Sequence, residues 1–194
     1  QEMGRACIEI LEQPANKLIG GPGVVVHIDE TVIIRGGEWT KSKCPSLMED
    51  DEPPVGSMWV LGAIEGVAGA RACWAVYVKE RTAETFTRIM KEHIRSGSII
   101  HSDGHRSYPP ACKALNLEHK VVIHADGLVT DDGVHTQKIE GWWSGLKKRR
   151  LLQGGVDREH IHTFLAEAVF LHRFAHDKST YRKGIQMLLQ RALN

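Results

Sequence analysis

The chain has 194 residues, of which 42% are hydrophobic and 25% charged, with a formal net charge of +1. This length fits one domain with a substantial core, and the composition is that of a globular protein. No apolar run approaches the length of a membrane-spanning helix, and we expect no signal peptide. The four cysteines are widely spaced and include no Cys-x-x-Cys pair, which argues against a zinc ribbon or a disulfide framework. We therefore expect an intracellular protein with reduced thiols and no membrane partner.

The first half of the chain predicts a short helix followed by three strands. Residues 7–19 indicate a helix that stops near Pro14, so residues 1–20 form only a short N-terminal segment. The three strands form an antiparallel meander, and the first is apolar enough to be a central strand. We place the strands at 24–34, 57–65 and 70–78, with a polar loop insertion at 35–57.

The second half of the chain alternates helices and strands. Strands are expected at 97–104 and 120–124, and helices at 82–94, 108–116, from about 136 onward, at 158–176 and at about 181–193. The last two are C-terminal helices within residues 158–194. This order predicts a single α/β domain over residues 1–194, with a five-stranded mixed sheet flanked by helices. In such a sheet the first and fourth strands lie side by side.

The stretch from Thr136 to Lys147 indicates the first turns of a helix that carries one carboxylate and one ammonium group. A helix advances about 100° per residue, so Glu140, Trp143 and Lys147 lie on one face, beside an apolar seam. Taken alone, this pattern fits a surface glutamate and lysine on an ordinary amphipathic helix. Two aspartates upstream favour a functional interpretation.

Three carboxylates fall where a site could form. Asp29 lies within the first strand, Asp103 at the end of the fourth, and Glu140 on the late helix. A charge in a buried strand is costly unless it is paired or bound to a metal. Because strand side chains alternate, Asp29 and Glu30 face opposite sides, and we expect only one of them in the site. Converging carboxylates repel one another unless divalent cations hold them.

Three blocks of the sequence resemble the motif blocks of Merlin-type DDE transposases, which are eukaryotic elements related to a group of bacterial insertion-sequence transposases. The blocks are 27–31, 101–108 and 133–147. The resemblance covers roughly residues 20–175 and implies an RNase H-like fold, as in retroviral integrases. It implies that Asp29, Asp103 and Glu140 are the catalytic and metal-binding triad. The cofactor would be Mg²⁺ or Mn²⁺, with two ions per site.

The same resemblance implies the catalytic core of a transposase, which cleaves DNA at transposon ends and joins the 3′-ends to a target. It would act as a homo-oligomer on DNA, in the nucleus of a eukaryote or the cytoplasm of a bacterium. Lys147 would contact a phosphate near the cut. The expected DNA-binding residues are Lys147, Lys148, Arg149 and Arg150.

Other readings of the same residues stay open. The auxiliary candidates are His101, His105, His124 and Trp143. Each histidine has a structural alternative, and the tandem Trp142 and Trp143 are either two core rings or one core ring and one DNA-stacking ring. Two functional alternatives also stand: a host-recruited descendant that binds DNA or protein without catalysis, and an RNase H-like nuclease that hydrolyses without strand transfer.

Overall fold

The computed structural model describes residues 2–34, 56–122, 136–175 and 177–192. Five strands form one sheet in the order β3-β2-β1-β4-β5. Their bounds are Val25–Ile34 (β1), Met58–Glu65 (β2), Cys73–Val78 (β3), Ile99–Ser102 (β4) and Glu118–Val121 (β5). β2 is antiparallel to β1 and to β3, whereas β4 is parallel to β1 and to β5. The predicted mixed sheet, with its first and fourth strands adjacent, is confirmed.

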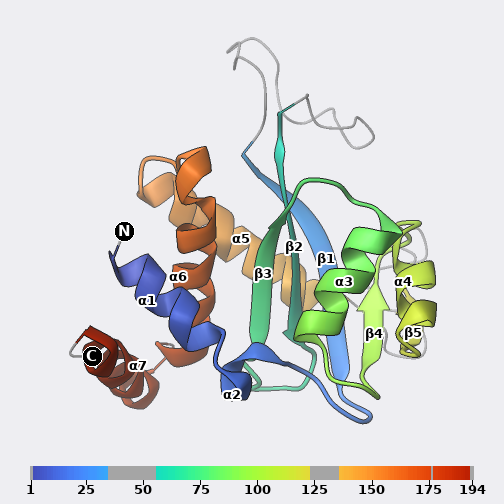
Figure 1. The fold of residues 1–194 in the computed structure, drawn as a ribbon, viewed down its shortest axis with the longest axis horizontal. Helices are drawn as coiled ribbons and strands as arrows, with labels where there is room; N and C mark the ends of the chain where they lie inside the picture. The colour runs from blue at the N-terminus through green and yellow to red at the C-terminus, as the bar shows by residue number, and fades with distance from the viewer. Residues whose placement is uncertain (1, 35–55, 123–135, 176, 193–194) are drawn as a thin grey trace.

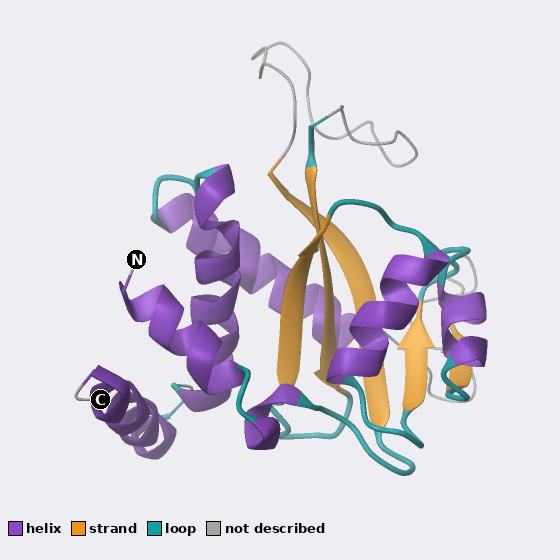
Figure 2. Ribbon diagram, in the orientation of Figure 1, coloured by secondary structure: helices purple, strands orange, loops and turns teal. Residues whose placement is uncertain are grey.

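Helices cover both faces of the sheet (Figure 2). On one face lie α3 (Ala83–His93) and α4 (Tyr108–Ala114), which share a core cluster with β1, β2 and β4. On the other lie α5 (Gln137–Leu152) and α6 (Ile161–Phe174), which share a second cluster with β1, β2 and β3. Outside α6 pack α1 (Glu2–Leu11) and α7 (Lys178–Ala192) (Figure 1).

The side chains of β1 alternate between the two faces of the sheet, so this strand contributes to both core clusters. Val26 and Ile28 are buried in the cluster beneath α3 and α4, whereas Ile33 is buried beneath α5 and α6. Residues of opposite parity therefore point to opposite faces, as side chains in a strand must. An apolar run without polar alternation is what a strand covered on both faces requires.

Several element boundaries differ from those expected. The first helix begins at Glu2 and ends at Leu11, and Pro14 starts a separate turn, α2 (Pro14–Lys17), because proline suits the first helical position. The third strand begins only at Cys73. β5 begins two residues and ends three residues earlier than expected, and a short 3-10 helix precedes α6. Thr82 is the N-cap of α3 and accepts a hydrogen bond from the Thr85 amide, as predicted.

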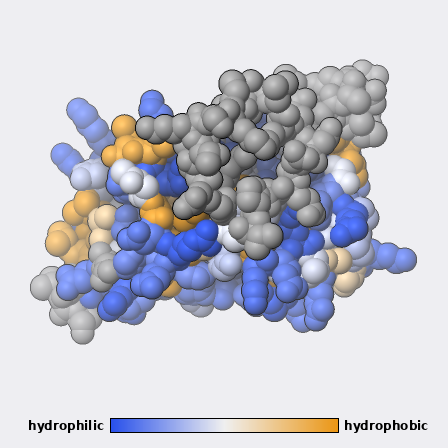
Figure 3. All heavy atoms as spheres, turned by 90° about the horizontal axis from the view of Figure 1, so that it is seen from above, coloured by the Kyte–Doolittle hydropathy of each residue, from blue (hydrophilic) through white to orange (hydrophobic). Residues whose placement is uncertain are grey.

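The described surface is mostly hydrophilic on the face seen from above, with hydrophobic patches gathered over the helices on the left (Figure 3). Leu151 and Leu152, at the end of α5, are among the exposed large hydrophobic side chains. In the described part of the chain, no helix combines the length and the apolar character that crossing a membrane demands. The cysteines found there, Cys7, Cys73 and Cys112, are buried free thiols.

Candidate active site

The site forms where β4 ends while β1 continues (Figure 1). β4 pairs with β1 only as far as His27, whose partner is His101, and ends at Ser102. Asp103 follows directly. Continuing the register by two residues sets Asp103 level with Asp29, in the space beyond the end of β4. Placing an aspartate at the carboxyl end of a parallel strand is a common way to build a site in an α/β sheet.

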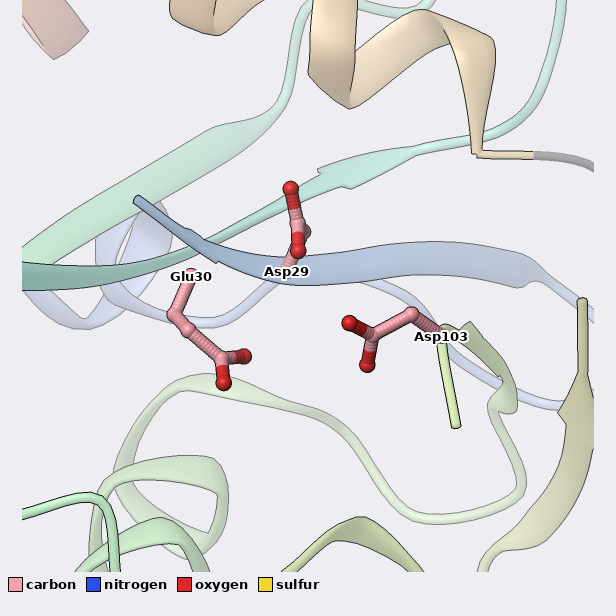
Figure 4. Close-up of side chains that lie close together, drawn as sticks. All are labelled: Asp29, Glu30 and Asp103. Atoms are coloured by element: carbon pink, nitrogen blue, oxygen red, sulfur yellow. The ribbon is translucent and has the colours of Figure 1, made fainter. Parts of the chain in front are cut away.

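Three carboxylates meet in this space. Asp29, Glu30 and Asp103 each offer one oxygen, and these oxygens lie within 4.8 Å of one another. Figure 4 shows Asp29 and Glu30 leaving opposite sides of β1, with Asp103 reaching between them. Ligand oxygens lie about 2.0–2.6 Å from a bound Mg²⁺ or Ca²⁺, so oxygens this close could share one ion.

The structure brings the carboxylates of both Asp29 and Glu30 close to Asp103, whereas strand alternation predicted only one of them in the site. Their side chains do start in opposite directions, as alternation requires. However, β4 has ended at this level, so a neighbouring strand does not separate the two faces beside β1. Side chains from both faces can therefore approach Asp103.

Asp29 lies under helix α5, and its environment opposes its charge. The indole Nε1 of Trp143 donates a hydrogen bond to Asp29 Oδ2 at 2.9 Å. Burial, with the neighbouring charges of Asp103 and Glu30, raises the pKa of Asp29 to about 7, although the Trp143 hydrogen bond acts in the opposite direction. The carboxyl group is thus poised to exchange its proton near neutral pH.

Gly62 makes room for the indole that holds Asp29. This glycine on β2 pairs with Asp29 across the two strands. A Cβ atom there would lie 2.5 Å from the Trp143 ring, so a larger residue would push the indole away. Trp142 and Trp143 are both buried, with ring centroids 4.9 Å apart. Both rings lie in the core cluster beneath α5 and α6, and the polar edge of Trp143 contacts Asp29.

Glu30 is held from three sides by side chains of the opposite face. The Tyr108 hydroxyl donates to Oε2, while Arg81 Nη1 lies 3.4 Å and His105 Nδ1 lies 3.7 Å from Oε1. The Glu30 side chain is only 4% exposed. Burial is the main reason that its pKa is raised, and burial also raises the pKa of Tyr108 well above its ordinary value.

This cluster was missing from the residues singled out by sequence. Glu30, Arg81 and Tyr108 come from β1, the turn before α3 and the start of α4, and no local spacing links them. The sequence did offer one indication, since Glu30 is a second acidic residue in a buried strand. It was not included in the site because side chains in a strand alternate between faces.

Two of the three histidine candidates, His101 and His105, lie among the described residues. The His105 backbone amide donates to Asp103 Oδ1 at 3.0 Å, which fixes the turn after β4. The His101 ring is buried and stacks on His27, with centroids 5.6 Å apart. His124 lies outside the described residues. His105 therefore orients Asp103 through its backbone, and His101 lies within the sheet.

Glu140 lies on α5 one turn before Trp143, on the helix that crosses β1. Its Oε1 accepts a hydrogen bond from Thr136 Oγ1 at 2.7 Å. Among the described residues, the carboxylate group close enough to share an ion contains Asp29, Glu30 and Asp103, without Glu140. The structure thus brings two members of the expected triad together and leaves the third on the adjacent helix.

The basic run of α5 is spread around the helix. Lys147 and Arg150 line a hollow that also borders Glu30 and the second half of β1. Arg149 points elsewhere and forms an ion pair with Glu167 at 3.2 Å. Lys148 is exposed. Two of the four expected DNA-binding cations therefore line the same hollow as Glu30.

Comparisons with known proteins identify a family whose model matches most of the chain. Residues 21–173 match the family model described as the ISXO2-like transposase domain. No curated protein matches the chain. The catalytic core domain of BIV integrase aligns over 87% of this chain and 97% of its own, at 14% identity and a TM-score of 0.49.

Other similar structures come from larger proteins. The Mos1 paired end complex with Mn aligns over 98% of this chain at 15% identity and a TM-score of 0.40. The chain spans 60% of the length of that Mos1 chain. The simian T-cell lymphotropic virus intasome aligns over 87% of this chain and 59% of its own, at 13% identity and a TM-score of 0.48.

The sequence match covers most of the chain and includes all three predicted motif blocks. It confirms the predicted transposase resemblance, and the five-stranded mixed sheet is the RNase H-like fold that this resemblance implies. The chain belongs to the ISXO2-like transposase domain family.

Proposed function

We propose that the chain is the metal-dependent catalytic core of a DDE transposase, which cleaves DNA at transposon ends and joins the 3′-ends to target DNA. The observation that carries this proposal is the convergence of Asp29 and Asp103 oxygens within 4.8 Å, in a chain of a transposase family. The partners would be transposon-end and target DNA, bound by a homo-oligomer. The Mos1 structures of paired ends with Mg and Mn support this view by analogy.

Asp29, Asp103 and Glu140 would hold Mg²⁺ or Mn²⁺, with two ions per site. The donor set fits, since these cations prefer carboxylate oxygens. Bound ions would lower the pKa of an attacking water or 3′-hydroxyl and neutralise charge on the phosphodiester. The protein supports this arrangement through neighbours: Trp143 orients Asp29, and the His105 amide orients Asp103.

We assign Glu140 rather than Glu30 as the third ligand. Both oxygens of Glu30 already face donors, namely Tyr108, Arg81 and His105. In the part of the chain that the structure describes, the hydrogen bond that Glu140 gives up if it turns toward Asp29 is the one from Thr136. Glu30 instead connects β1 to the segment after Asp103, because Tyr108 and His105, which contact Glu30, belong to that segment.

The test is an assay with a pre-cut transposon-end duplex that bears a free 3′-hydroxyl, a target plasmid and Mn²⁺. We expect joined products with the parent and none with Asp103→Asn. Hydrolysis of the duplex without joining would favour a plain nuclease. Binding without either product would favour a host-recruited descendant.

Lys147→Ala should weaken DNA binding and reduce its salt dependence by about one phosphate contact, because Lys147 lines the hollow that borders Glu30. Mn²⁺ affinity should stay nearly unchanged. The measurement is fluorescence anisotropy with labelled DNA across a salt series. Lys91→Ala, an exposed lysine on α3, is the matched control. Equal salt slopes for the two variants would show that Lys147 makes no phosphate contact and is an ordinary solvent-exposed lysine.

A further inference from the structure

The second half of β1 borders a hollow of about 620 Å³. Its wall includes residues 30–34 of β1, which point alternately to the two faces. This arises because the pairing of β1 with β4 stops at His27, and beyond that level no other strand of the described residues covers this edge of β1. The lining of the hollow includes Glu30, whose carboxylate lies close to those of Asp29 and Asp103.

The two rims of the hollow differ in chemistry. Lys147 and Arg150, from α5, supply positive charge on one rim. Trp59, from β2, supplies a large ring on the other. A hollow that combines cations, an aromatic ring and an open strand edge matches the way proteins bind a nucleic acid strand. The charge is opposite to that of a phosphate backbone.

Arg81 is fixed against the aromatic rim. Its guanidinium carbon lies 3.7 Å from the centroid of the Trp59 ring, and its Nη1 lies 3.4 Å from Glu30 Oε1. Its backbone oxygen accepts a hydrogen bond from Ser107 Oγ at 2.7 Å. The side chain keeps 24% of its surface exposed. A planar guanidinium is thus held against Trp59, a residue that lines the hollow, and near Glu30, with part of its surface exposed.

We propose that Arg81, stacked on Trp59, binds a phosphate of the DNA strand that lies in this hollow, opposite Lys147 and Arg150. The inference rests on the proposed function and adds a binding residue from the other face of the sheet. Arginine suits this position because its fork of N–H donors matches phosphate oxygens in two places at once. Because Trp59 and Glu30 already restrict the side chain, little further freedom is lost when a phosphate binds.

The alternative is that Arg81 serves only as the counter-ion of Glu30. The two roles predict different salt dependence. A phosphate contact contributes a slope of about 0.7 for a single strand or 0.9 for a duplex in a plot of log affinity against log salt. A counter-ion buried within the protein contributes none.

The experiment measures DNA affinity by fluorescence anisotropy across a salt series in EDTA, so that it does not require catalysis. Arg81→Gln should lower the affinity several-fold and reduce the slope by about one contact, whereas Arg81→Lys should retain the slope. Arg88→Gln is the matched control, because Arg88 lies on α3 with a 65% exposed side chain. Slopes that are equal for Arg81→Gln and Arg88→Gln would overturn the proposal.

Trp59→Leu provides a second test if Arg81→Gln fails to fold. It keeps every charge but removes the ring that holds the guanidinium. We expect several-fold weaker binding with a nearly unchanged slope, and parental affinity in a folded Trp59→Leu protein would also overturn the proposal. Loss of strand transfer in the parent protein would instead count against the proposed function, since these binding measurements do not depend on it.

Discussion

Glu140→Gln is expected to reduce DNA cleavage and strand transfer by roughly three orders of magnitude, while Glu30→Gln should retain much more activity. Losing a metal ligand removes several kcal/mol of transition-state stabilisation, and each 1.4 kcal/mol corresponds to about tenfold in rate. Glutamine keeps the size of glutamate and an oxygen that can still accept the Thr136 hydrogen bond. The loss would therefore report on charge and ligation, not on folding of α5.

Glu30→Gln is the matched comparison, because it makes the same chemical change one residue from Asp29. Its oxygen can still accept from Tyr108, but the ion pair with Arg81 loses its charge. We expect a moderate loss of activity and a Mn²⁺ affinity close to that of the parent. Isothermal titration with Mn²⁺ and the joining assay measure the two effects. If Glu30→Gln abolished Mn²⁺ binding and Glu140→Gln did not, the metal set would be the three clustered carboxylates instead.

The sheet could be predicted because each strand carries its own local signal. The run of β1 is apolar enough to be covered on both faces, and the meander β1-β2-β3 follows from turns along the chain. The adjacency of Asp29 and Asp103 then follows from the mixed order of the strands. Ends of elements were less accurate, as β5 shows, because neither a proline nor a cap marks its start.

The surroundings of the acids could not be read from the chain. The Glu30 carboxylate can approach those of Asp29 and Asp103 because β4 stops at Ser102. A β4 longer by two residues would lie beside Asp29 and separate the two faces of the sheet there. The Trp143 contact with Asp29 depends on the lack of a side chain at Gly62, which lies far away in the sequence. Such features come from tertiary packing, whereas sequence periodicity reports only which face of an element is buried.

The charges of the cluster should make the metal-free protein less stable as the pH rises. Asp29 has a folded pKa of about 7, against an unfolded value near 3.8. A carboxyl group with a raised folded pKa stabilises the fold fully below the unfolded pKa, and this contribution is lost as the pH rises through about 7. Three pKa units correspond to about 4 kcal/mol as an upper limit. In EDTA, the melting temperature should therefore be lower at pH 8 than at pH 5.5.

Asp103→Asn should weaken this pH dependence and remove the response to metal. The charge of Asp103 is the second largest cause of the raised Asp29 pKa, after burial, so neutralising it lowers that pKa toward its ordinary value. The asparagine oxygen can still accept from the His105 amide, so the turn after β4 is kept. At pH 8 in EDTA, the variant should melt at the same temperature as the parent or higher, although it should be catalytically inactive.

Mn²⁺ should reverse the order of the two proteins. An ion that binds only the folded state at ten times its Kd stabilises it by about 1.4 kcal/mol, which is several degrees for a chain of this size. The parent should gain this increase at pH 8, and less at pH 5.5 because Asp29 must first lose its proton. Asp103→Asn should gain little at either pH.

Asp103→Ala separates the role of Asp103 as a metal ligand from its role in the turn after β4. This variant also loses the His105 hydrogen bond, so it should be less stable than Asp103→Asn by about 1 kcal/mol. If Asp103→Asn instead lowered the metal-free melting temperature and kept the full Mn²⁺ response, Asp103 would be a turn residue and not a ligand.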